Sequence, residues 1–122
     1  MVTKTSTVIQ NCLQFSVLSS NQVDFSKLQD PARNTHIGCH GTYILHAEEP
    51  LTVTLGFYAD GRSYNMRHTI IGITTLESQV NFYENHPETI TILIKPGEKH
   101  IINAKNSSNN SAHLCWVDIE RF

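Results

Sequence analysis

Short runs of alternating apolar and polar residues recur along this chain, and Gly, Pro, Asn or Asp closes most of them. The clearest run spans residues 51–58, where Leu51, Val53, Leu55 and Phe57 alternate with smaller or more polar neighbours. Side chains of a β-strand point alternately to two faces, so this run predicts a strand with one buried face. A sustained helical period is missing, which argues against a helical bundle.

Further strands are expected wherever β-branched and aromatic residues gather between turn signals. These are one bent strand over 7–17, a short strand or helical turn within 19–31, a strand over 37–45 with a bulge or a close backbone approach at Gly38 and Gly41, a return strand from Arg62, two short strands in 68–85 divided near Glu77 and Ser78, strands over 89–95 and 100–104, and a last strand over 112–122 with Leu114, Trp116 and Ile119 toward the core. Asp60-Gly61 and Pro96-Gly97 are expected as hairpin turns, and the NSSNNS segment 106–111 as a loop.

Eight to ten strands without repeats predict an all-β fold, either an antiparallel β-sandwich, a jelly roll or a closed barrel. The chain has 122 residues, the usual size of one domain, so residues 1–122 are expected to form a single jelly-roll domain.

Charge limits the class of partner. Nine Lys and Arg stand against eleven Asp and Glu, a net charge of −2, so nucleic acid is not an expected partner. No stretch of about eighteen apolar residues occurs, so no membrane span is expected. The first twenty residues lack the apolar centre of a signal peptide, which predicts a soluble protein that is cytoplasmic or released by another route. The three cysteines, Cys12, Cys39 and Cys115, are expected to be reduced and mostly buried.

One candidate binding site follows the apolar strand. Asp60, Arg62, Tyr64 and Arg67 supply a carboxylate, guanidinium groups and an aromatic ring, the groups that hold neutral sugars. The alternative is that Asp60-Gly61 only turns the chain and that the arginines are solvated.

Histidines suggest a different chemistry. His36, His40 and His46 are spaced by even numbers, so one strand face can direct them toward a metal, although strand histidines without a ligand role are common. The segment 92–103 resembles the second motif of the cupin family at Gly97, His100 and Asn103. The first cupin motif is matched only loosely, by His36, Gly38, His40 and Glu48. This resemblance implies a metal-binding enzyme or sensor with His100 and two of His36, His40 and His46 as ligands, whereas an ordinary Pro-Gly turn explains the same segment without a metal.

A longer stretch, from His36 to the end, resembles the jelly rolls of the tumour-necrosis-factor and complement-globular-head superfamily. The matching positions are Gly41 and Tyr43, Asp60 and Gly61, Gly97 and Glu98, and the apolar run 114–122. The resemblance implies a homotrimer that binds rather than catalyses, with core or subunit-contact aromatics at Tyr43, Phe57, Phe82, Tyr83, Trp116 and Phe122.

A bacterial lectin branch of that fold binds sugars near an Ala-Asp-Gly turn, and the segment 58–67 is similar to it. This adds Tyr58 and Ser63 to Asp60, Tyr64 and Arg67 as sugar-binding candidates. No nucleophile elbow, phosphate-binding glycine loop or dinucleotide motif occurs, so neither catalysis nor a cofactor is expected. The leading hypothesis is a homotrimeric lectin for a carbohydrate or glycosylated surface. The alternatives are the metal-binding cupin and a structural subunit of a virion or fibre.

Overall fold

Ten β-strands make up the regular secondary structure of the residues that the structure describes. The computed structural model describes residues 4–10, 13–19, 39–71, 74–82, 88–108, 110 and 112–121, and the statements below concern these residues. The strands are β1 (Lys4–Gln10), β2 (Leu13–Ser19), β3 (Cys39–His40), β4 (Thr42–Ala47), β5 (Leu51–Phe57), β6 (Ser63–Ile70), β7 (Thr74–Asn81), β8 (Glu88–Ile94), β9 (Lys99–Lys105) and β10 (His113–Arg121).

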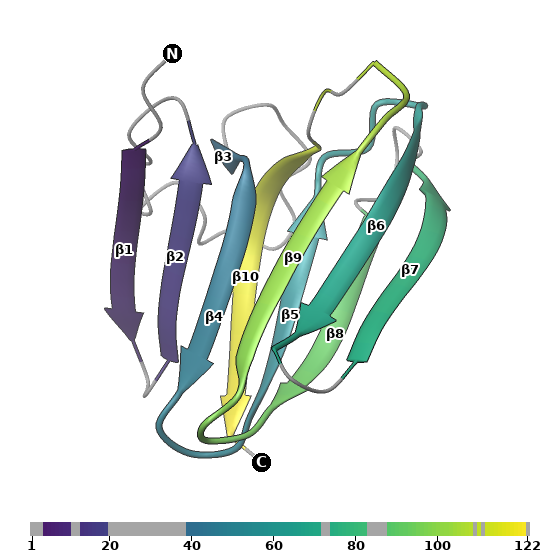
Figure 1. Ribbon diagram of the computed structural model, residues 1–122. Helices are drawn as coiled ribbons and strands as arrows, with labels where there is room; N and C mark the ends of the chain where they lie inside the picture. Colours follow the sequence, from purple (N-terminus) through teal and green to yellow (C-terminus); the bar gives the residue numbers. More distant parts are fainter. Residues whose placement is uncertain are drawn as a thin grey trace.

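The strands form two sheets that face one another (Figure 1). The six-stranded sheet has the order β1-β2-β4-β9-β6-β7, and the four-stranded sheet has the order β3-β10-β5-β8. Every pair of neighbours is antiparallel. The predicted all-β antiparallel sandwich is therefore confirmed.

The last eight strands pair as one long hairpin rolled into two layers. β3 pairs with β10, β4 with β9, β5 with β8, and β6 with β7, so the pairs are nested around the β6–β7 turn. Pairing of β10 with β5 joins the strands of the four-stranded sheet, and pairing of β6 with β9 joins those of the six-stranded sheet. This is the jelly-roll arrangement, to which the β1–β2 hairpin adds two strands through β4.

The core lies between the sheets and is built mainly from alternate residues of β2, β4, β5, β6, β8 and β9. Leu51, Val53, Leu55 and Phe57 of β5 are all fully buried, as the alternation predicted. The rings of Phe57 and Tyr43 lie 5.8 Å apart, and those of Phe57 and Phe82 lie 5.9 Å apart. Tyr43, Phe57 and Phe82 are thus core residues rather than subunit contacts.

Two strand boundaries differ from the sequence expectation. Residues 7–17 are not one bent strand, because the hairpin of β1 and β2 pairs Gln10 with Leu13. The division expected near Glu77 and Ser78 lies instead between Ile70 and Thr74, and both residues fall within β7. β-Branched residues continue on both sides of each break, so composition alone did not mark the ends.

The expected hairpin turns join different sheets instead of paired strands. Gly61 and Gly97 adopt φ values of 79° and 86°, which confirms the need for glycine at both turns. However, β5 and β8 belong to the four-stranded sheet, whereas the strands that follow them, β6 and β9, belong to the six-stranded sheet. Each turn is therefore a corner of the sandwich.

Trp116 lies on the outer face of the four-stranded sheet, which corrects its expected place in the core. The register of β10 against β5 shifts between Leu114 and Trp116, and Leu114 and Cys115 are consecutively buried. This bulge displaces the inward and outward alternation by one residue. Trp116 then packs over Gly56, where an added Cβ would lie 2.1 Å from the indole nitrogen.

Only some of the remaining expectations concern residues that the structure describes. The single bulged strand expected over 37–45 is wrong: Gly41, with a φ of 148°, lies between β3 and β4, and these two strands belong to different sheets. Cys115 is a buried free thiol whose pKa burial raises to about 11. The expectations for residues 20–31 and 36–38, for Tyr83 and Phe122, and for the Cys12 side chain lie outside the described residues.

Candidate functional site

The β5–β6 turn and the β9–β10 loop meet at one end of the sandwich. The Tyr58 amide donates to the carbonyl oxygen of His113 at 2.7 Å, and the Ala112 amide donates to that of Ala104 at 2.8 Å. In Figure 1 both connections lie at the upper end, away from the C-terminus. We call this region the loop end, defined by residues 58–62 together with 106–108, 110 and 112.

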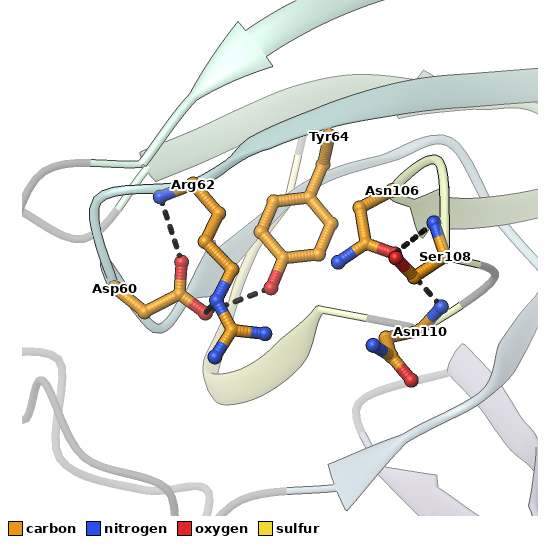
Figure 2. Close-up of polar contacts among 6 residues, drawn as sticks. All are labelled: Asp60, Arg62, Tyr64, Asn106, Ser108 and Asn110. Carbon is orange, nitrogen blue, oxygen red and sulfur yellow. Dashed lines mark hydrogen bonds and ion pairs between the residues drawn. The ribbon is translucent and has the colours of Figure 1, made fainter.

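Asp60 is the polar centre of the loop end (Figure 2). Its Oδ1 accepts the Arg62 amide proton at 3.0 Å, and its Oδ2 accepts the Tyr64 hydroxyl proton at 2.7 Å. Arg62 Nε lies 3.7 Å from the same Oδ2. The Asp60 side chain is 17% exposed and the Arg62 side chain 61% exposed, so a fixed carboxylate stands beside a solvent-accessible guanidinium.

Tyr64 positions Asp60 and does not present an aromatic surface. It is only 3% exposed, and its ring lies 4.7 Å from that of Phe82. Burial, followed by the hydrogen bond to Asp60, raises the pKa of Tyr64 to about 12, so its hydroxyl remains a donor at neutral pH. The sequence expectation that Tyr64 covers a sugar ring is therefore corrected.

Asn106 follows β9 and lies on the other side of Tyr64 from Asp60 in Figure 2, and it was not among the predicted binding residues. Its Oδ1 accepts the amide protons of Ser108 at 3.0 Å and of Asn110 at 2.9 Å. These two bonds fix the orientation of the amide group, and its nitrogen points to the side of Tyr64 in Figure 2. The asparagine-rich segment 106–111 predicted a loop, but the sequence did not indicate that the Asn106 amide would point toward Tyr64.

The other sugar-binding candidates lie in different surroundings. Tyr58 is half-buried at the loop end. Ser63 donates a hydrogen bond to Asn81 of β7. Arg67 is exposed and lies three residues after Tyr64 on β6, so it points to the opposite face of the sheet. The structure thus brings together Asp60, Arg62 and Tyr64, with Tyr58 nearby, and leaves Ser63 and Arg67 outside.

The metal-binding alternative has no assembled centre in the part of the chain that the structure describes. His46 is exposed, whereas His100 is fully buried. His46 pairs with Lys99 across the β4–β9 ladder, and His100 pairs with Leu45, so the two imidazoles point to opposite faces. His36 and the His40 side chain lie outside the described residues, and no group of three or more metal-ligating side chains occurs within them.

His100 instead belongs to a buried chain of polar groups. Its Nε2 lies 3.0 Å from Glu98 Oε1, and its Nδ1 lies 2.7 Å from His68 Nε2. Both histidines face the core from adjacent strands, with ring centres 5.0 Å apart. His68 was not among the candidate residues, because 32 residues separate it from His100 in the sequence.

Comparison of the chain with protein-family models, with curated proteins and with solved structures found no match. The described residues contain no helix, and therefore none of the length and apolar character needed to cross a bilayer. Jelly rolls serve lectins, capsids and cupins alike, so the strand order does not choose among these functions. A functional assignment therefore depends on the residues of the loop end.

Proposed function

We propose that this protein is a non-catalytic recognition module that binds carbohydrate at the loop end. The observation that carries the proposal is the fixed Asp60 carboxylate beside the exposed Arg62 guanidinium. Sugar hydroxyls both donate and accept hydrogen bonds, and bonds to charged groups are stronger than bonds between neutral ones. An adjacent acceptor and donor suit two neighbouring hydroxyls of one sugar ring.

Rigidity supports this assignment. Asp60 is held by Arg62 and Tyr64, and the Asn106 amide is held by Ser108 and Asn110. A site whose polar groups are already oriented loses less conformational entropy when a ligand binds. In this proposal Asp60, Arg62 and Asn106 contact the sugar, half-buried Tyr58 supplies apolar surface, and Tyr64 keeps the carboxylate in place.

The homotrimer is part of the proposal, and its support lies on the outer face of the six-stranded sheet. Leu18, Ile44 and Ile101 are half-buried there, and Ile44 pairs directly with Ile101 across the β4–β9 ladder. Grouped apolar side chains on an outer face are commonly covered by association. Second copies of this chain are the proposed cover.

A glycan array with wild-type protein, followed by calorimetric titration of the strongest glycan, tests sugar binding. Arg62→Ala is expected to weaken affinity about tenfold or more, equivalent to about 1.4 kcal/mol. Arg67→Ala is the matched control, because it removes the same charge from the opposite face of β6, and its affinity should stay within about twofold of wild type. Silence of the wild type on the array, or equal affinities for wild type and Arg62→Ala, contradicts the site.

Light scattering of the wild type at micromolar concentration tests the trimer separately. A trimer is expected, and Ile44→Lys should shift it to monomer by placing a charge in the apolar group. A monomeric wild type contradicts the trimer. The sugar site is tested separately by the glycan array.

A further inference from the structure

The Glu98–His100–His68 chain is separate from the loop end. Glu98 lies in the β8–β9 turn, and His100 pairs with Ile70 at the end of β6. In Figure 1 the β8–β9 turn lies at the lower end of the sandwich, opposite the β9–β10 loop. A buried chain of titratable groups at this position has no task in the proposed recognition of a ligand.

The hydrogen bonds fix where the protons sit. Glu98 Oε1 accepts the Lys95 amide proton at 2.9 Å and lies 3.0 Å from His100 Nε2. A carboxylate only accepts, so His100 Nε2 carries a proton. A neutral imidazole has one N–H, so His100 Nδ1 accepts from His68 Nε2 at 2.7 Å. When both rings are neutral, the chain therefore holds one proton on each ring, both on Nε2.

The intact chain accommodates one additional proton at most. That proton enters at His68 Nδ1, the ring nitrogen that neither hydrogen bond uses. Two charged rings would place N–H donors face to face across 2.7 Å with no acceptor between them. Burial, and then the neighbouring His100, lower the pKa of His68, while Glu98 opposes this shift.

Among the side chains that the structure describes, no other charge faces His68 and His100 to stabilise a second proton. The inward residues of β4, β5 and β8 at this end are apolar: Leu45, Leu51 and Ile94. The titratable groups on the inner faces of those strands, Tyr43 and Glu88, lie toward the loop end. On β7 the register partner of His68 is Leu76.

At the rim of the lower end, Arg121 of β10 pairs with Glu49 at 3.2 Å. Lys95 is exposed, and its charge acts on Glu98. Besides burial, His100 lowers the pKa of His68 and Glu98 raises it.

We propose that the His68–His100 pair is a pH-sensitive latch that closes the β8–β9 end of the sandwich near neutral pH and opens when both rings are protonated. Opening separates β6 from β9 at this end, because the two donors repel. It also frees Glu98 from His100, and Glu98 is the acceptor that holds the Lys95 amide in the turn.

Urea unfolding between pH 7.5 and pH 5 tests the latch. In the unfolded chain both histidines titrate near pH 6.5, whereas the closed pair holds one added proton at most. As the pH falls well below 6.5, unfolding therefore adds about one proton or more to these two rings, and the equilibrium constant for unfolding should rise about tenfold for each unit by which the pH is lowered.

His68→Gln removes the like-charge conflict, because the Gln amide can offer its nitrogen or its oxygen to His100. Unfolding of this variant should take up about one proton fewer than unfolding of the wild type. Its unfolding constant should therefore change about tenfold less per pH unit. His46→Gln is the matched control, since His46 is exposed on the neighbouring strand, and it should keep the wild-type slope. Equal slopes for wild type and His68→Gln overturn the latch.

Histidine NMR on the wild type gives an independent test if His68→Gln does not fold. At pH 7.5 both rings should be protonated on Nε2, and at most one proton should be added while the protein remains folded. A full titration of both His68 and His100 within the folded state overturns the proposal.

Discussion

At the scale of single residues, Tyr64 shows how position decides chemistry. An aromatic phenol next to an Asp-Gly turn has the composition of a sugar platform, yet the Tyr64 ring packs on Phe82 inside the sandwich. Only its hydroxyl reaches the loop end, where it holds Asp60. The structure brings Asp60, Arg62 and Tyr64 of the predicted set together, and burial gives Tyr64 a supporting role among them.

Tyr64→Phe is expected to lower the free energy of unfolding by about 1 to 2 kcal/mol, because a partly buried hydrogen bond to a carboxylate is lost. The pKa of Tyr64 is raised to about 12, above the ordinary value of 10.0, so its contribution is complete below pH 10 and is lost as the pH rises toward 12. Urea unfolding at pH 8 and pH 11 should therefore show a smaller difference between wild type and Tyr64→Phe at the higher pH. A difference that stays constant or grows contradicts this role.

At the scale of elements, β5 is a strand in which alternation predicts the buried face correctly, and β10 is one in which it does not. The alternation in β5 is uninterrupted, so its buried face was predicted residue by residue. In β10 one bulge displaces the alternation, so Leu114 and Cys115 are both buried and Trp116 turns outward. The bulge depends on the partner strand, because Gly56 is the residue that leaves space for the indole.

Gly56→Ala tests this packing. The new Cβ would lie 2.1 Å from Trp116 Nε1, so the indole must move, and a loss of about 1 to 3 kcal/mol is expected from overpacking. The same change in a Trp116→Ala background should cost less than about half as much, because the obstacle is gone. Thr54→Ala, on the outer face of the same strand, is the control and should cost less than about 1 kcal/mol. Additive losses in the double variant contradict direct contact.

At the scale of the whole molecule, the nested pairs make local opening uneven across the six-stranded sheet. β9 lies between β4 and β6 and is bonded on both sides, whereas β1 is an edge strand bonded only to β2 within this sheet. Long-range pairing of this kind was not predictable from turns, because Asp60-Gly61 has the same local chemistry in a hairpin and at a corner. The His68–His100 contact depends on the same pairing of β6 with β9.

Amide hydrogen exchange should follow this order. Amides of β1 are expected to exchange through local opening, at rates at least about tenfold higher than those of β9, which should exchange only with global unfolding. Mass spectrometry of peptides from the two strands after timed labelling measures the difference. Slower exchange in β1 than in β9 would show that the hairpin is more firmly held than its pairing indicates.

The sequence by itself determined the fold class, the inner face of β5 and the glycine turns, because each of these depends on residues that are close together in the chain. It also placed Asp60, Arg62 and Tyr64 in one predicted group, from which the structure separates Ser63 and Arg67. Tertiary structure decided which strands share a sheet, that the Asn106 amide points toward Tyr64, and that His68 meets His100. Those outcomes depend on contacts between distant strands, and such contacts form only when apolar faces from the whole chain are buried together.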